Sequence, residues 1–221
     1  MTTPNAHNAE IVIFDWDGTL YDSADRIVQS VFSAADELEM PRPDAQRIRQ
    51  VIGLGLDEAM KRAFDIQDIM DILKYTDVYK RHYHTTWAGH SALFDGVREL
   101  LDALNKAGKI VTIATGKSRS GLEGAMKEQD VKHCFDYTIT GPETVSKPDP
   151  TMLNMTLEEF SLSPKQAVMI GDTSFDMEMA ANIEMPRLGV NWGVHTDKEM
   201  LAHNPIGVMQ NMAELKAALL P

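Results

Sequence analysis

The feature that most constrains the fold is a regular alternation of short apolar segments and amphipathic segments after residue 93. The apolar segments are rich in β-branched side chains, which is typical of buried strands, and they cover residues 109–115, 136–140, 167–170, 187–190 and 206–209. The amphipathic segments carry apolar residues at helical spacing and cover residues 97–106, 118–129, 150–160, 175–183 and 212–220. This alternation predicts an α/β fold with a doubly wound parallel sheet, that is, a Rossmann-like core.

The segment that follows the first expected strand, at residues 10–14, has a different pattern. From residue 23 to about residue 87 the apolar residues follow helical spacing, and no strand pattern interrupts them. The expected helices cover residues 23–40, 44–51, 57–64 and 66–87. Prolines end the first of these helices and two glycines, Gly53 and Gly55, separate the second from the third.

These patterns predict two structural units. Residues 1–20 and 90–221 form the α/β core, and residues 21–89 form a small all-helical cap inserted after the first strand. Ligands of open α/β sheets bind at the carboxyl ends of the strands. An insertion at this point of the chain therefore lies over the expected site, where a lid would lie.

The first strand ends in two carboxylates. Asp15 and Asp17 stand on a tight turn that Gly18 makes possible, in the segment Asp-Trp-Asp-Gly-Thr. Either aspartate alone has an ordinary explanation as a turn or helix-capping residue. Two anions held this close repel each other, which indicates a bound cation, a shared proton, or both. Together they suit a metal-assisted reaction with a carboxylate nucleophile.

Composition limits the partners. The net charge of −12 argues against nucleic acid or an anionic membrane as the main partner, because both require a cationic surface. The single cysteine, Cys134, excludes an internal disulfide, fits a reducing compartment, and is expected to be a buried thiol. With no signal-peptide pattern and no apolar run of about 18 residues, we expect a soluble, cytoplasmic protein. The sequence leaves the oligomeric state open.

Further candidate residues stand at the carboxyl ends of the later strands or in the loops after them. They are Thr115, Gly116, Lys147, Asp172 and Asp176. Each alone is weak evidence, but parallel strands end at the same edge of a sheet, so we expect all of them to converge on the opening aspartates. Carboxylate oxygens are the ligands that Mg²⁺ prefers, and the remaining donors suit a phosphoryl group that bridges to the cation.

With these motifs in order, the chain resembles the haloacid dehalogenase superfamily, in particular its phosphatases with a helical cap after the first strand, and among them the phosphoglycolate phosphatases. The resemblance covers nearly the whole chain. It rests on four motifs: the segment from Asp15 to Thr19, the segment from Thr115 to Lys117, Lys147 with the proline after it, and the segment from Gly171 to Asp176.

The resemblance implies an Mg²⁺-dependent phosphatase acting on a small phosphomonoester. Asp15 would attack phosphorus to form an aspartyl-phosphate, and Asp17 would protonate the leaving oxygen and then activate water. An acid at position 17 suits an oxygen leaving group rather than a halide. Mg²⁺ would be held by Asp15, the backbone carbonyl of Asp17 and Asp172, with Asp176 orienting its surroundings. The phosphoryl oxygens would be bound by Thr115, Lys147 and the backbone at Gly18 and Gly116.

Two departures from the family pattern bear on the pocket. Gly116 stands where phosphoglycolate phosphatases typically carry Asn, so we expect a roomier pocket edge. In the cap, Gly53 and Gly55 match the position of the family's specificity loop, but their neighbours are apolar. Arg49 and Lys61 flank this loop and are candidates for contact with a substrate carboxylate or hydroxyl.

Two other functions remain open from the sequence. A mutase of the β-phosphoglucomutase type shares the four motifs and the cap, but it needs a second acid–base group from the cap, and no histidine soon after Ser23 supplies one. A receiver-like phospho-switch also uses acidic residues, a threonine and a lysine on a doubly wound sheet. The acid at position 17 and the helical cap count against that second alternative.

Overall fold

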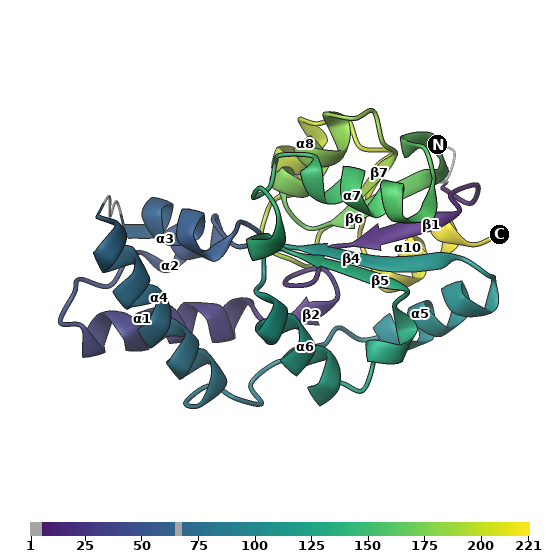
Figure 1. Ribbon diagram of the computed structural model, residues 1–221. Helices are drawn as coiled ribbons and strands as arrows, with labels where there is room; N and C mark the ends of the chain where they lie inside the picture. Colours follow the sequence, from purple (N-terminus) through teal and green to yellow (C-terminus); the bar gives the residue numbers. More distant parts are fainter. Residues whose placement is uncertain (1–5, 65–67) are drawn as a thin grey trace.

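The computed structural model describes residues 6–64 and 68–221 and confirms the doubly wound parallel sheet (Figure 1). Within these residues the sheet has six parallel strands in the order β5-β4-β1-β6-β7-β8. Their bounds are β1 (Ile11–Phe14), β4 (Ile110–Thr115), β5 (Tyr137–Thr140), β6 (Ala167–Gly171), β7 (Arg187–Val190) and β8 (Gly207–Met209). The first strand thus lies in the middle of the sheet, between β4 and β6.

Helices cover both faces of this sheet. On one face lie α5 (Val97–Lys106), α6 (Arg119–Glu128) and α10 (Met212–Leu219), and on the other lie α7 (Thr151–Phe160) and α8 (Ser174–Ala181). Side chains alternate between the faces of a strand, so Val12 and Phe14 pack against the first group and Ile11 and Ile13 against the second. Strands buried on both faces explain the continuous apolar runs in the sequence.

A separate helical unit follows the first strand. It contains α1 (Ala24–Glu37), α2 (Ala45–Arg49), α3 (Leu56–Phe64) and α4 (Ile69–His84). It has its own apolar cluster, in which Val31, Ile72 and Tyr75 are almost fully buried. The expected start of the fourth helix, at residues 66 and 67, lies outside the described residues.

Several short elements have no counterpart in the sequence prediction. A two-stranded antiparallel sheet of β2 (Tyr21–Asp22) and β3 (Ala92–Leu93) joins the two connections between the helical unit and the core. The others are α9 (Asp197–Leu201) and 3₁₀ turns at Lys132–Cys134, Gly141–Glu143 and Pro164–Gln166. Elements of two to five residues are too short to show a periodic pattern.

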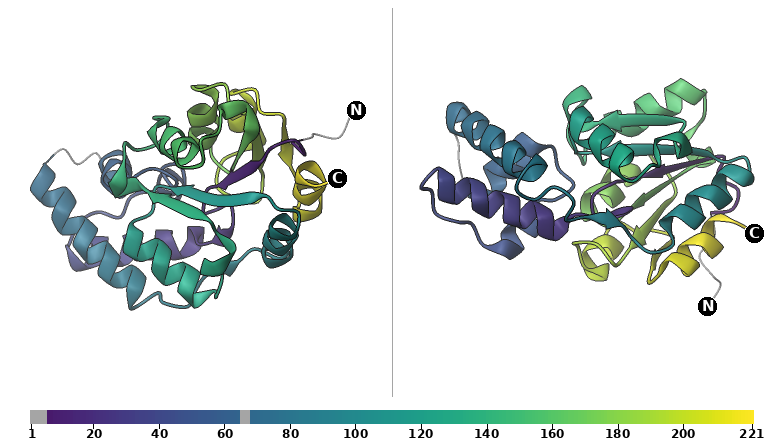
Figure 2. Two further views of the ribbon diagram at one scale, coloured as in Figure 1. Left: turned by 45° about the vertical axis from the view of Figure 1, so that its right-hand side comes forward. Right: turned by 90° about the horizontal axis from the view of Figure 1, so that it is seen from below.

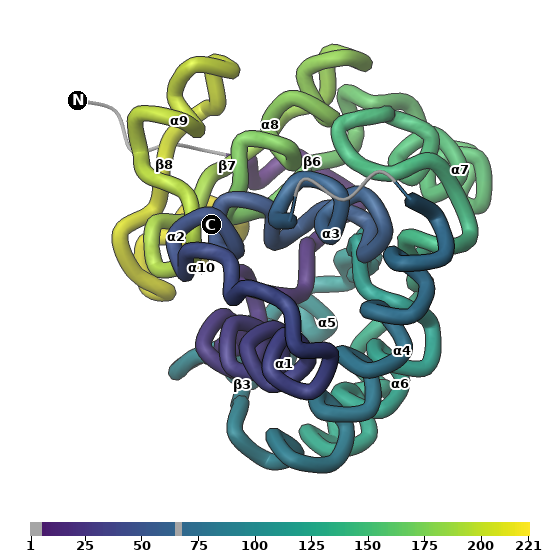
Figure 3. Tube along the Cα trace, turned by 90° about the vertical axis from the view of Figure 1, so that its left-hand side faces the viewer, coloured from purple at the N-terminus to yellow at the C-terminus, as the bar shows by residue number. Residues whose placement is uncertain are grey.

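The helical unit lies beyond the carboxyl ends of the strands. In Figure 1 the strand arrows point toward α1–α4, and the carboxyl terminus lies at the opposite end of the core. The view from below in Figure 2 separates the same two units, and Figure 3 looks onto the four helices with the core behind them. Among the described helices, none is both long and apolar enough to cross a membrane.

Candidate active site

The expected site residues follow neighbouring strands at one edge of the sheet. Phe14, the last residue of β1, pairs in register with Ile113 of β4 and Ile170 of β6. The residues at the carboxyl ends of these strands therefore lie side by side, as the parallel arrangement predicts. They include Asp15, Thr115 and Asp172, all of which are buried.

Three carboxylates and one lysine form the centre of the site. Asp15, Asp172 and Asp176 are fully buried, and one oxygen of each lies within 4.8 Å of the others. The Nζ of the buried Lys147 is 2.9 Å from Oδ1 of Asp15 and 2.6 Å from Oδ1 of Asp176. Oδ2 of Asp15 has no hydrogen-bond partner among the described residues. An acceptor that is buried and unpaired in this way is available to bind a further group.

The fold fixes Asp172 and leaves it little room. Its Oδ1 accepts from the hydroxyl of Thr19 at 2.8 Å, and its Oδ2 accepts from the backbone N–H of Val194 at 2.9 Å. Gly18 has a φ of +83°, and a Cβ at that position would lie 2.3 Å from Oδ2 of Asp172. The turn after β1 therefore requires glycine both for its backbone conformation and for its distance to this carboxylate.

Asp176 is held in a different way. It follows β6 in the first turn of α8, where it forms a capping box with Thr173. Its Oδ2 accepts from the Thr173 hydroxyl at 2.6 Å, while its Oδ1 faces Lys147. One carboxylate thus stabilises the start of a helix and positions the lysine of the site.

Electrostatics in the cluster favour neutralisation of its negative charge. Burial, followed by the charge of Asp176, raises the pKa of Asp15 to about 7 despite the nearby ammonium of Lys147. Burial and then the charges of Asp15 and Asp176 raise the pKa of Asp172 well above its usual range. Burial lowers the pKa of Lys147, but the charges of Asp15 and Asp176 outweigh burial and raise it overall. One lysine does not balance three buried carboxylates, so the cluster favours protons or a further cation.

The donor set fits a magnesium ion. Mg²⁺ prefers oxygen ligands and is often bound through one or two carboxylates, and this cluster offers three together with an unpaired oxygen of Asp15. The carboxylate of Asp17 does not belong to this cluster. That separation is compatible with the expectation that position 17 contributes its backbone carbonyl rather than its side chain.

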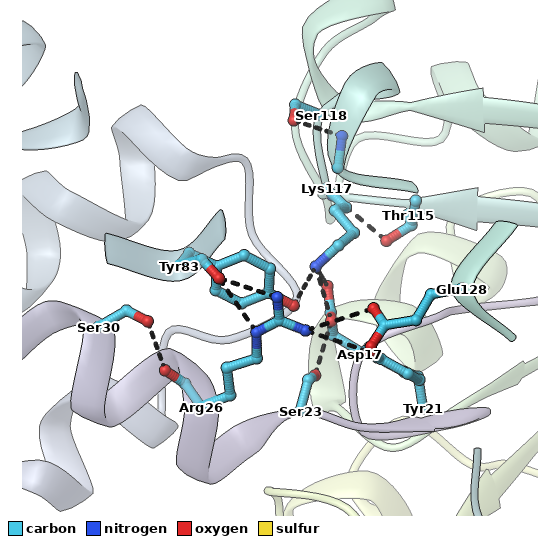
Figure 4. Close-up of polar contacts among 11 residues, drawn as sticks. Asp17, Tyr21, Ser23, Arg26, Ser30, Tyr83, Thr115, Lys117, Ser118 and Glu128 are labelled. Carbon is cyan, nitrogen blue, oxygen red and sulfur yellow. Dashed lines mark hydrogen bonds and ion pairs between the residues drawn. The ribbon is translucent and has the colours of Figure 1, made fainter. Parts of the chain in front are cut away.

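The side chain of Asp17 instead lies at the boundary with the helical unit α1–α4. Its Oδ1 accepts from the hydroxyl of Ser23 at 2.6 Å, and the Nζ of Lys117 lies 3.0 and 3.1 Å from its two oxygens (Figure 4). Lys117 also lies 3.0 Å from the hydroxyl of Tyr83 on α4. Burial lowers the pKa of Lys117, but the charge of Asp17 and the contacts with Tyr83 and Tyr79 together outweigh burial and raise it overall.

A second cation, from the helical unit, joins this network. The buried Arg26 of α1 donates to the backbone carbonyl of Tyr83 at 2.8 Å and stacks over the Tyr83 ring at 4.0 Å. It also donates to the hydroxyl of Tyr21 at 3.3 Å and lies 3.9 Å from Glu128 of the core. Through Lys117, Tyr83 and Arg26, these contacts connect Asp17 to residues of the helical unit and of the core.

Sequence reasoning did not assign Ser23, Arg26, Tyr83 or Lys117 to the site. Lys117 was part of a recognised motif, but nothing in the sequence indicated which carboxylate it would meet. The contact of Ser23 with Asp17 is local, whereas Tyr83 meets Arg26 from a distant part of the helical unit and Lys117 from outside it. Such contacts between distant segments have no periodic signal in one sequence.

Gly116 does not open the pocket edge, contrary to expectation. A Cβ at this position would lie 2.4 Å from the backbone oxygen of Leu54 and 2.5 Å from that of Gly53. The space that a side chain would occupy is filled by the backbone of the cap loop. Thr115, beside it, is buried, and its hydroxyl accepts from the backbone N–H of Lys117 at 3.3 Å.

Of the residues expected to shape the substrate pocket from the helical unit, two lie next to the site and two do not. Gly53 and Gly55 lie on the loop that contacts the core, and the backbone N–H of Gly55 donates to the hydroxyl of Ser146 at 2.8 Å. Arg49 instead pairs with the exposed Asp25 of α1. Among the described residues that line the cavity next to the site, neither Arg49 nor Lys61 appears.

Known proteins resemble this chain over nearly its whole length. A protein named "Probable phosphatase IndB" from Dickeya dadantii is 30% identical, and the match covers 94% of this chain and 92% of that protein. A phosphoglycolate phosphatase from Agrobacterium fabrum is 28% identical over 95% of this chain and 91% of that protein. A solved structure of a haloacid dehalogenase-like family hydrolase from Streptococcus pneumoniae is 26% identical, with a TM-score of 0.83 over 96% of this chain and 99% of that one.

The family described as haloacid dehalogenase-like hydrolase matches residues 12–190. This range begins in β1 and ends with β7, so it includes every strand whose end contributes to the site. It also includes the carboxylate cluster, Lys147 and the helical unit. The chain therefore belongs to the haloacid dehalogenase-like hydrolases.

Proposed function

We propose that this hydrolase is an Mg²⁺-dependent phosphatase that cleaves a small phosphomonoester through an aspartyl-phosphate on Asp15. The observation that carries the proposal is the Asp15 carboxylate: it is buried, faces Lys147 on one side, and has an unpaired oxygen within a cluster of three acids. A carboxylate nucleophile divides a slow displacement into two easier ones. Relatives named as phosphatases support the same activity.

In the first step an oxygen of Asp15 attacks phosphorus, and the bond from phosphorus to the leaving oxygen breaks. Asp17, two residues further on, gives its proton to that oxygen, so the product leaves as an alcohol. In the second step Asp17 takes a proton from water as the water attacks phosphorus, which releases inorganic phosphate and regenerates Asp15. General acid–base catalysis of this kind contributes about 10²–10⁴-fold.

The rest of the rate acceleration is electrostatic, because phosphoryl transfer depends mostly on positioning and charge neutralisation. Lys147 and Thr115 would bind phosphoryl oxygens, together with backbone N–H groups at Gly18 and Gly116. The metal would be held by the side chains of Asp15 and Asp172 and the carbonyl of Asp17, with Asp176 supporting Lys147 and the metal's surroundings. When bound, Mg²⁺ supplies positive charge to the phosphoryl oxygens.

The helical unit would act as a cap. We propose that residues 21–89 form this cap and that residues 1–20 and 90–221 form the catalytic core. The loop with Gly53 and Gly55 would shape the substrate pocket, because its backbone rests on Gly116. The pairing of Arg49 with Asp25 leaves that arginine a weaker candidate for substrate contact.

The test is phosphate release from p-nitrophenyl phosphate and from a panel of metabolite phosphates, with Mg²⁺ and after chelation. We expect metal-dependent turnover that Asp15→Asn abolishes. The same panel includes β-glucose 1-phosphate, because formation of glucose 6-phosphate would support the mutase alternative. Membership in a hydrolase family argues against a receiver-like phospho-switch, which would give a long-lived phosphoprotein instead. If no phosphomonoester is hydrolysed, the proposed function is wrong.

A further inference from the structure

A cavity of about 90 Å³ lies between the cap and the core. The core side of its lining includes Asp17, Thr115, Gly116 and Lys117. If Asp17 protonates the leaving oxygen, the group attached to that oxygen extends into this cavity. The chemistry of the lining therefore bears on which alcohol the enzyme releases.

The cap side of the cavity is mainly aliphatic. It is formed by side chains from α1, α2, α3 and the loop before α3, including Ile27, Val31, Ile48, Ile52, Leu54 and Met60. Most of these residues are buried, so the wall they form is held in place by the cap's own packing. Tyr79 and Tyr83 of α4 complete it.

Cations in the lining are few and mostly committed. Lys117 is already bound by Asp17 and Tyr83. Partial burial, followed by the charge of Lys117, lowers the pKa of His84, which favours its neutral form. Lys80 also lines the cavity but is exposed to solvent. A carboxylate deep in this cavity would lose its hydration against aliphatic side chains, which is costly without a partner charge.

The volume sets a size for the occupant. One water molecule needs roughly 10–15 Å³ of cavity volume, so this cavity has room for more than one water-sized group. A benzyl group matches the space better than glycolate does, whereas an isobutyl group has the size of glycolate and differs from it in lacking the charge.

We propose that the physiological leaving group is an uncharged, largely apolar alcohol that fills this cavity, and that the enzyme disfavours phosphomonoesters with a carboxylate on the leaving group. This inference rests on the proposed phosphatase function and narrows its substrate class. It separates this chain from the relatives named phosphoglycolate phosphatase, to which it is 24–28% identical.

The test compares kcat/KM for phosphoglycolate with kcat/KM for isobutyl phosphate, which has the same branched shape without the charge, and for benzyl phosphate. We expect both uncharged esters to exceed phosphoglycolate by about tenfold or more, since an unpaired buried charge is costly. A preference for phosphoglycolate would overturn the inference while leaving the phosphatase function intact. Absence of all phosphomonoester hydrolysis would instead refute the proposed function, and this inference with it.

Variants of Ile27 give a second, internal measurement. Ile27 is half-buried on α1 and lines the cavity, so Ile27→Arg places a cation against the leaving group. We expect the kcat/KM for isobutyl phosphate, divided by the kcat/KM for phosphoglycolate, to fall by about tenfold in this variant. Ile27→Met should keep the ratio, and so should Leu73→Arg, which adds the same charge at an exposed position of α4. Because the ratio is taken within each variant, partial loss of folded protein does not affect it. An unchanged ratio in Ile27→Arg would contradict the placement of the leaving group.

Discussion

At the scale of residues, each aspartate of the opening pair has its own lysine. Lys147 lies against Asp15 within the carboxylate cluster, and Lys117 lies against Asp17 at the boundary with the cap. The two carboxylates therefore stand in different surroundings although they are two residues apart. The two roles can therefore be tested separately, because a substitution at either carboxylate leaves the lysine contact of the other in place.

Asp17→Asn tests the second of these roles. The substitution keeps the shape of the side chain and leaves the carboxylate cluster intact, so we expect metal binding to persist and kcat to fall by about 10²–10⁴-fold. The loss should be larger for alkyl phosphates than for p-nitrophenyl phosphate, whose leaving group needs little protonation. Steady-state kinetics on both substrates measures this difference, and full turnover by the variant would exclude the acid–base role.

Lys117→Met tests whether this lysine positions Asp17. Its removal leaves Asp17 with Ser23 as its remaining side-chain donor among the described residues, so the carboxylate is held less firmly. We expect kcat to fall by about tenfold, equivalent to about 1.4 kcal/mol, with little change in KM because Lys147, the proposed phosphoryl-binding residue, is unchanged. Tyr83→Phe, which removes only the hydroxyl next to Lys117, serves as the milder comparison. A wild-type kcat in Lys117→Met would contradict the positioning role.

At the scale of elements, the cap loop and the turn after β4 fit together by their backbones. The oxygens of Gly53 and Leu54 occupy the place where a side chain at position 116 would stand. Two further contacts join the units. Nε2 of His195 lies 3.3 Å from the backbone oxygen of Gln50, and the backbone N–H of Gly55 donates to the hydroxyl of Ser146. The closeness of the cap to the site thus depends on a glycine of the core.

Gly116→Ala should therefore hold the cap away from the core. A Cβ about 2.4 Å from a backbone oxygen cannot be accommodated without movement of the loop, so we expect kcat/KM to fall and small-angle scattering to show a larger radius of gyration. Gly124→Ala is the matched control, because a Cβ at that position of α6 meets nothing within 4 Å. It should leave activity unchanged and raise the free energy of unfolding by about 0.4–1 kcal/mol. Equal activity in both variants would show that the contact at Gly116 is unimportant.

The helices and strands also show which parts of the fold and of the site can be predicted from the sequence. The strands of the sheet and the helices on its faces were predictable because buried strands and amphipathic helices have distinct periodicities. Convergence of Asp15, Thr115 and Asp172 was predictable because parallel strands end at one edge. The pairing of Lys117 with Asp17 was not predictable, because the direction of a side chain after a strand has no periodic signal. The loop against Gly116 was not predictable, because it depends on how the helical unit meets the sheet. The expected roomier pocket edge was wrong for that reason.

At the scale of the whole molecule, the site concentrates negative charge inside a protein that is itself acidic, with a net charge of −12. Asp15 has a pKa of about 7 in the folded protein against 3.8 for an unperturbed side chain, chiefly because of burial. Between these two values the folded protein binds more protons than the unfolded chain. By linkage, this group's contribution to stability is present below about pH 4 and is lost as the pH rises toward 7.

The loss of stability with rising pH leads to a prediction about metal removal. With a chelator present, wild-type protein should lose stability between about pH 5 and pH 7 relative to Asp15→Asn, which lacks the titrating carboxyl. Mg²⁺ should restore more stability at about pH 8 than at about pH 5, because it binds the ionised cluster. Thermal unfolding of both proteins across this range, with and without Mg²⁺, measures the effect. A metal effect that is equal at both pH values would be inconsistent with ionised ligands at this cluster.

The most direct test of the central claim is to look for the phosphoryl group on Asp15. Wild-type protein is mixed with p-nitrophenyl phosphate and Mg²⁺, quenched in acid within the first turnover, digested, and analysed by mass spectrometry. We predict that the peptide containing Asp15 gains the mass of one phosphoryl group, that this mass decays as phosphate is released, and that Asp15→Asn never acquires it. Turnover with no phosphorylated peptide at any time, or a phosphoryl group on another residue, would contradict the account.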